Sequence, residues 1–109
     1  MFTLTENPTF AHDIDVAVPV DGGYEQRKLK VRFRVLDADT LIGFDLSTAE
    51  GQTRFCDQVV EGFEDLQSPD GKPVTCNDRI RKQLTGTPYI RSALMAHYTR
   101  ALIQAERKN

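Results

Sequence analysis

The stretch that decides the fold is DIDVAVPVDGGYEQRKLKVRFRV, residues 13–35. Apolar and polar residues alternate along it on both sides of a central Asp-Gly-Gly. Alternation with a period of two is typical of a strand with one buried and one solvated face, and glycines accept the backbone angles of a tight turn. The stretch therefore predicts an antiparallel β-hairpin over residues 12–36.

Both faces of this hairpin are satisfied if the turn closes at Gly22-Gly23. Val16 then lies opposite Leu29 on the buried face, and Asp15 lies opposite Lys30 on the solvated face. A shift of the register by one residue would move the apolar side chains of one strand to the solvated face, so the pattern specifies the faces strongly. Longer loops, with partner numbers that sum to 47 or 49 instead of 45, keep the same faces and are the alternative.

Two features concern the edges of the sheet. Pro19 has no N–H to donate to a neighbouring strand, which indicates an edge strand or a bulge. Phe2, Leu4 and Phe10 are spaced so that they could supply a short extra strand beside the hairpin. A hairpin alone is marginal in water, so we expect other elements to cover its apolar face.

After Leu36 the spacing becomes helical. Capping residues and apolar positions three to four apart predict helices over residues 40–44, from Ser47 or Thr48 to about Gly62, over 77–84 and over 88–107. We expect an α+β fold: an N-terminal antiparallel β-hairpin in a small sheet of two or three strands, followed by three to four α-helices packed on one face. The chain is expected to form one domain over 1–109, with the helical part at 38–108.

These helices have individual start signals and inner faces. Asp37 or Asp39 caps the first helix, a capping box at Thr75 starts the third and Thr87-Pro88 starts the last. The residues expected on inner faces are Phe55, Val59, Phe63, Ile80, Leu84, Ile90, Leu94, His97 or Tyr98, Ala101, Leu102 and Ala105.

The net charge of −2 conceals alternating blocks. The net charge is −4 over residues 1–23, +4 over 24–35, −8 over 36–71 and +6 over 72–109. We expect the first two blocks to cancel across the hairpin, and the last two to pair inside the fold or to form complementary surfaces between subunits. A pI near 5.6 lacks the basic excess typical of nucleic-acid-binding domains, so no nucleic acid is expected.

The residue types that carry catalysis or bind metals are sparse. Cys56 and Cys76 lie far from any CxxC spacing, and His12 and His97 are the two histidines, so no zinc site is expected. We expect reduced thiols, although the spacing alone also permits a disulfide between the two cysteines. The adjacent acids Glu64-Asp65 are typical of a solvated turn. We therefore predict no enzyme activity, no cofactor and no metal, and with no apolar run of about 20 residues, no membrane span.

Four segments resemble the small tail assembly chaperones of long-tailed bacteriophages and prophages. They are VAVPVDGG at 16–23, KLKVRFRVLDADT at 28–40, FCDQVVEGFEDLQSPDGKPV at 55–74 and TPYIRSALMAHYTRALIQAERKN at 87–109. The resemblance covers residues 8–109. It lies in the order of an extended segment, a charged strand, an acidic turn with Asp-Gly and a closing alanine-rich helix.

The resemblance implies a protein that acts by binding, without catalysis, in the cytoplasm of a bacterial host. Its implied partners are the phage tape-measure protein and also the tail tube protein, and it is expected to be a homo-oligomer. We expect an exposed part of the hairpin face or of the final helix to supply the apolar contact. The candidate residues of the interaction surface are Lys28, Lys30, Arg32, Arg34, Phe63, Arg91 and Tyr98.

Two other functions fit the same sequence. Another small phage structural protein, such as a tail completion or head–tail connector component, would be found in purified virions. A small enzyme or a regulator of host factors would need a pocket that joins Cys56 with a histidine, or a basic surface.

Overall fold

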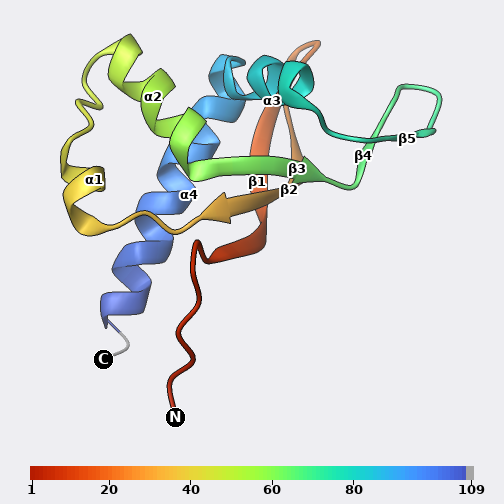
Figure 1. The fold of residues 1–109 in the computed structure, drawn as a ribbon. Helices are drawn as coiled ribbons and strands as arrows, with labels where there is room; N and C mark the ends of the chain where they lie inside the picture. Colours follow the sequence, from red (N-terminus) through yellow and green to blue (C-terminus); the bar gives the residue numbers. More distant parts are fainter. Residues whose placement is uncertain (108–109) are drawn as a thin grey trace.

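A computed structural model describes the backbone of residues 1–107 and the side chains of residues 1–100. The elements follow one another as β1 (Thr9–Val20), β2 (Gly23–Arg34), α1 (Ala38–Ile42), α2 (Ala49–Val59), β3 (Val60–Glu64), β4 (Leu66–Gln67), β5 (Pro73–Val74), α3 (Asp78–Thr85) and α4 (Pro88–Arg107). Figure 1 shows the hairpin of β1 and β2, with helices that follow it in the chain. The predicted α+β fold is confirmed.

The hairpin has the predicted faces but another register. Val20 pairs with Gly23, so the turn residues are Asp21 and Gly22, and Ile14 faces Leu29 in place of Val31. The predicted register and the longer loops are therefore wrong. Gly22 has a φ of +81° and reverses the chain, while Gly23 already belongs to β2. Because the shift is two residues, every side chain stays on its predicted face.

The third strand comes from a segment that was predicted as helix. α2 ends at Val59, and β3 pairs antiparallel with β2, with Val31 opposite Phe63. The β-branched pair Val59-Val60 and the following Gly62 favour an extended chain there over a helix. The predicted strand at Phe2 and Leu4 is wrong.

The sheet has the order β1-β2-β3, so β1 is an edge strand, as Pro19 indicated. Phe10 belongs to β1, whereas Phe2 and Leu4 are each 92% exposed in an irregular segment that precedes it. A second, two-stranded sheet joins β4 to β5, which are connected by a turn at residues 68–72. Gly71 in this turn has a φ of +84°.

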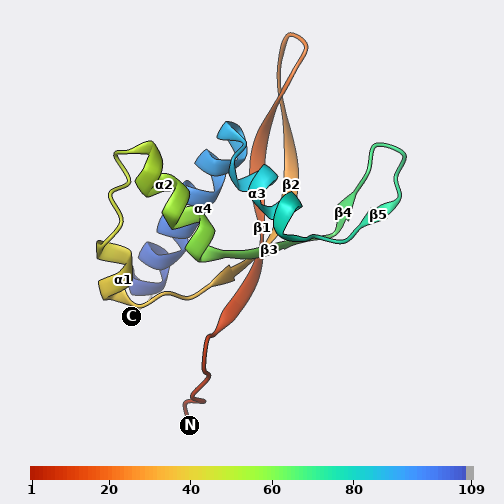
Figure 2. The same ribbon diagram turned by 45° about the horizontal axis from the view of Figure 1, so that its top comes forward.

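One face of the three-stranded sheet packs against α2 and α4 (Figures 1 and 2). The buried apolar side chains come from β1, β2, β3, α2 and α4 and are Ile14, Val16, Val31, Phe33, Phe55, Cys56, Val59, Val60, Phe63, Ile90, Leu94 and Tyr98. The hydroxyl of Tyr98 donates to the carbonyl of Arg34 at 3.0 Å and accepts from the N–H of Leu36 at 3.4 Å. This pair of bonds fastens α4 to the end of β2.

Side-chain caps set the starts of the shorter helices. The carboxylate of Asp37 accepts from the N–H of Thr40 at the start of α1, and the hydroxyl of Thr48 accepts from Gly51 at the start of α2. At α3 the cap is Asn77, which accepts from Ile80, and not the predicted Thr75. The apolar stripe predicted at residues 101–105 lies outside the described side chains.

Two further predictions concern the thiols and the membrane. Cys56 is buried and Cys76 is partly exposed, and both are free thiols. Of the helices within residues 1–107, none is long and apolar enough to cross a membrane.

Candidate functional site: the hairpin hollow and the edge groove

The predicted basic stripe lies on the open face of the sheet and is matched there by acids. Lys28 contacts Asp15 of β1 at 2.5 Å. On the opposite side, Arg32 Nε donates to Glu64 Oε2 at 2.8 Å, and this hydrogen bond lowers the pKa of the Glu64 carboxyl. Lys30 lies 3.7 Å from Asp65. Acidic residues of β1 on one side and of the end of β3 on the other thus partly neutralise the basic stripe.

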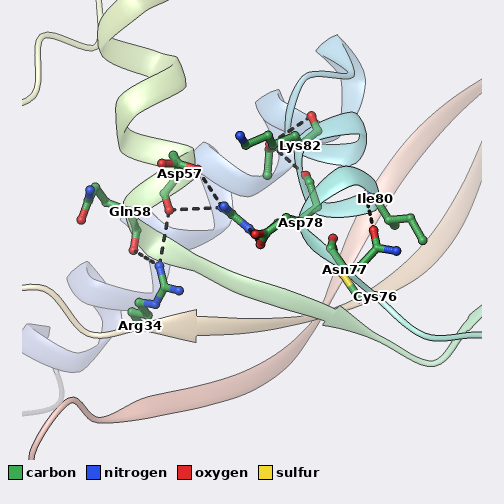
Figure 3. Close-up of polar contacts among 10 residues, drawn as sticks. Arg34, Asp57, Gln58, Cys76, Asn77, Asp78, Ile80 and Lys82 are labelled. Carbon is green, nitrogen blue, oxygen red and sulfur yellow. Dashed lines mark hydrogen bonds and ion pairs between the residues drawn. The ribbon is translucent and has the colours of Figure 1, made fainter.

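Arg34 lies at the end of α2. Its guanidinium donates to the carbonyls of Asp57 and Gln58 at 3.4 and 3.3 Å, and Figure 3 shows it beneath them. Arg81 of α3 donates to the Asp57 carboxylate at 2.8 Å. The last carbonyls of a helix lack partners within the helix and carry partial negative charge. The two arginines therefore stabilise the junction of α2, β2 and α3.

Three further predicted surface residues have structural contacts. Phe63 and Tyr98 are 3% and 1% exposed, so the prediction that they belong to an interaction surface is corrected: both are core residues. Arg91 donates from Nε to the carbonyl of Thr85 at 2.9 Å and so ties the start of α4 to the end of α3. The periodic apolar pattern that contains Phe63 already placed it on an inner face.

A hollow lies on the core-facing side of the hairpin, between its distal half and the start of α4. We call it the hairpin hollow. Its volume is about 310 Å³. The apolar residues that line it are Val16, Val18, Leu29, Leu66, Tyr89 and Ile90, and the charged residues around them are Arg27, Lys28, Lys30, Glu64 and Asp65. An apolar lining with a rim of both charges is typical of a surface that binds another amphipathic chain.

The distal hairpin projects beyond the body of the protein (Figure 2). Val18 is partly buried and Val20, next on the same face, is 41% exposed, while Tyr24 at the tip is 75% exposed. The apolar alternation thus continues past the point where this chain covers it. The sequence contained this signal, because the apolar alternation of β1 continues to Val20, next to the turn.

A second depression, which we call the edge groove, follows the outer edge of β1 alongside α4. Its volume is about 680 Å³. β1 and β2 contribute His12, Asp13, Ile14, Asp15, Ala17, Tyr24 and Gln26, and α4 contributes Tyr89, Ser92, Ala93, Ala96, His97 and Arg100.

The two histidines meet in the edge groove. His12 Nδ1 lies 3.0 Å from His97 Nε2, and the His97 ring stacks on Phe33 with centroids 5.7 Å apart. Burial lowers the pKa of His97, and the neighbouring His12 lowers it further. His97 was predicted on the apolar stripe of its helix, but no sequence signal linked it to His12, 85 residues away.

The hydrogen-bond pattern shows which main-chain groups of β1 face the groove. The Val35 N–H donates to the Pro8 carbonyl at 3.0 Å, and the register with β2 continues from there without a bulge. In an antiparallel pair the bonded positions alternate. The even-numbered residues of β1 therefore bond to β2, and the odd-numbered ones, from Thr9 to Ala17, direct their N–H and C=O groups outward. Pro19, which lacks an N–H, falls on this outward set.

Among the side chains of residues 1–100, no three His, Cys, Asp or Glu groups come together as a metal site would require, and the histidine pair has no third such group beside it there. Burial raises the pKa of the Cys56 thiol, which opposes its ionisation to a nucleophile. Comparisons of the chain with protein-family models, with curated proteins and with solved structures found no match.

Proposed function

We propose that this protein is a phage or prophage tail assembly chaperone that binds the tape-measure protein in the hairpin hollow, without catalysis, in the bacterial cytoplasm. Two lines support the proposal. One is the resemblance of residues 16–23, 28–40, 55–74 and 87–109 to that family. The other is a surface suited to a long helical client.

The observation that carries the proposal is the uncovered apolar face of the distal hairpin. Val18 and Leu29 are partly exposed in the hairpin hollow, and Val20 continues the same face toward the tip. Val18 and Leu29 border the core, whereas Val20 lies outside it and is 41% exposed. An amphipathic helix can lay its apolar stripe on such a surface and set its charges against a mixed rim.

The charged rim of the hollow would orient a bound client. The basic residues Arg27 and Lys28 come from β2, and the acidic residues Glu64 and Asp65 come from the end of β3 and the position after it. Charge pairs at a solvated rim contribute little affinity but orient the partner. A chaperone that must later be displaced by tube subunits benefits from this combination of modest apolar area and orienting charges.

The test is co-expression with the tape-measure protein of the same phage or prophage. Wild-type protein should raise the yield of soluble tape-measure protein and should co-purify with it. Val18→Asp should abolish both effects, because it places a carboxylate in the hollow. Pro19→Asp, on the adjacent residue and the opposite face, is the matched control and should behave as wild type.

Two results would contradict the proposal. If the wild-type protein did not co-purify with the tape-measure protein at any salt concentration, the tape-measure protein would not be its client. Presence of the chain at stoichiometric amounts in purified virions would favour a tail completion or head–tail connector component. The melting temperatures of both variants must stay near that of the wild type for the comparison to hold.

A further inference from the structure

The outer edge of β1 offers main-chain hydrogen bonds that nothing among the described residues takes up. The outward positions Thr9, Ala11, Asp13, Asp15 and Ala17 follow from the register derived above. A long edge strand of this kind is a template for another strand, and proteins usually blunt or cover it. Pro19, near the tip, is the residue of the outward set of β1 that lacks an N–H, and the charges of Asp13 and Asp15 restrict which strands can pair there. The edge groove beside it provides space for the side chains of an added strand.

The same chain carries a segment with the pattern of the missing strand. Residues 1–5 read Met-Phe-Thr-Leu-Thr, with Phe2 and Leu4 on one side and the threonines on the other. Aromatic, β-branched and alternating residues of this kind favour strands. We call residues 1–6 the arm. Phe2 and Leu4 are each 92% exposed, so their own chain does not cover them.

The arm does not reach its own edge groove in this structure. It runs away from the sheet before β1 begins, as both ribbon views show (Figures 1 and 2). Asn7, with a φ of +50°, and Pro8 set the direction of the chain where the arm meets β1. The arm of a second copy can reach the edge groove, because the chain direction at Asn7 and Pro8 limits only the approach of an arm to its own groove.

From these observations we propose that the arm of one copy adds as a strand to the outer edge of β1 in a second copy, with Phe2 and Leu4 packed in the edge groove. At about 3.3 Å per residue, the six residues of the arm span roughly 20 Å, which is half of the twelve-residue β1. Phe2 and Leu4 would contact the small side chains of Ala93 and Ala96. The proposal does not depend on the proposed function.

Charge favours the arm over the β1 edge of a second copy. If two β1 strands paired edge to edge, Asp13 and Asp15 of both copies would share one face of the joint sheet. Like charges opposite one another destabilise a strand pair. The arm brings threonine hydroxyls beside these acids instead, and Glu6 is its single charged side chain.

The first test is sedimentation velocity over a concentration series. Wild-type protein should self-associate, and the double variant Phe2→Ser/Leu4→Ser should dissociate at least tenfold more readily. Both positions are exposed in the single chain, so the variant should keep the wild-type melting temperature. Thr3→Ser/Thr5→Ser is the matched control on the other side of the arm and should associate as wild type does.

The edge is tested with a pair of variants at one position. Asp13→Pro removes an outward N–H but no bond between β1 and β2, and should abolish association. Asp13→Ala loses the same carboxylate but keeps the N–H, and should associate like the wild type. Circular dichroism should show that both variants are folded.

Mixing gives the decisive result. The Phe2→Ser/Leu4→Ser chain keeps an intact edge, and the Asp13→Pro chain keeps an intact arm, so each alone should be monomeric while the mixture forms a one-to-one complex. The proposal is overturned if wild-type protein remains monomeric up to millimolar concentration, if the arm variant associates as strongly as wild type, or if the mixture forms no complex. A monomer with the arm folded back on its own edge would give the first of these results. Failure of tape-measure binding would leave all of these measurements unchanged.

Discussion

His12 and His97 bring their ring nitrogens to within 3.0 Å of each other at the place where the edge strand β1 meets α4. Residues of β1, β2 and α4 surround the two rings. Phe10 and Phe33 contact the rings, and the charged groups nearby are Arg100 on α4 and Asp15 on β1. A short contact between two imidazoles requires that at least one of them be neutral, since two imidazolium ions would repel each other. The contact therefore couples the attachment of α4 to pH.

The contact between His12 and His97 predicts that the free energy of unfolding decreases in mild acid. The pKa of His97 in the folded protein is lowered from its ordinary value of 6.5, mainly by burial and then by His12. As the pH falls, the unfolded chain therefore takes up the proton before the folded protein does. The free energy of unfolding should be highest above pH 6.5 and should decrease as the pH drops below that value. Urea unfolding at a series of pH values between 8 and 5 measures this slope.

A control for the pH effect is His97→Gln. It keeps a polar side chain of similar reach but cannot take up a proton, so its free energy of unfolding should vary less between pH 7 and pH 5.5 than that of the wild type. An equal slope in the two proteins would assign the pH dependence to other groups. The carboxylates with lowered pKa values, such as Asp37 and Glu64, titrate at lower pH and do not confuse the comparison.

The turn residues provide a test of the hairpin register. Gly22 has a φ of +81°, whereas Gly23 lies in β2 with open space around it. Gly22→Ala should lower the free energy of unfolding by about 1–2 kcal/mol, because a side chain in the left-handed region is strained. Gly23→Ala should change it by less than about 0.5 kcal/mol. Thermal or urea unfolding of both variants checks the prediction, and a comparable cost at both positions would favour a turn centred on Gly22-Gly23.

The core face of the hairpin gives a larger effect. Val31 is fully buried opposite Phe63, so Val31→Asp should cost about 3 kcal/mol or more and leave the protein unfolded or aggregated. Lys30→Asp changes the neighbouring residue on the open face, where an exposed pair contributes at most about 1 kcal/mol. Circular dichroism and melting temperatures distinguish the two. A Val31→Asp protein that melts like the wild type would show that the faces are assigned wrongly.

The comparison of sequence and structure shows where local patterns suffice. Alternation in residues 13–35 predicted the faces, and the caps at Asp37 and Thr48 predicted two helix starts, because each depends on neighbours in the chain. The register failed by two residues because both glycines could occupy the turn, and only one has the left-handed conformation. The third strand was missed because residues 60–64 also satisfy a helical spacing that continues from α2.

The candidate surfaces were predicted less well. The basic strand was identified, but its pairing with Glu64 and Asp65 depends on the unforeseen third strand. Phe63 and Tyr98 were placed on an interaction surface although the apolar pattern that contains each of them favoured the core. The edge groove joins β1 to α4 through a contact between residues 85 positions apart, and no local pattern encodes such a contact.

The start of α2 offers a last prediction, in which two effects oppose each other. Gly51 lies in the first turn of this helix, where alanine has a higher helix propensity by about 1 kcal/mol. A Cβ at this position, however, would lie 1.7 Å from the carbonyl oxygen of Asp45, a backbone atom that cannot move aside alone. Gly51→Ala should therefore lower the free energy of unfolding by about 1–3 kcal/mol, as overpacking does.

Urea unfolding measures this change, and the chain offers a matched comparison in Thr53→Ala. Thr53 lies two residues after Gly51 in the same helix and, unlike Gly51, is exposed. Its hydroxyl donates to the carbonyl of Ala49 at 2.9 Å. Because such a bond to the preceding turn adds little in a helix and alanine has the higher propensity, Thr53→Ala should be neutral or slightly stabilising. If Gly51→Ala were also stabilising, the loop at Asp45 would have to pack less closely on α2 than the structure shows, and propensity alone would govern the start of this helix.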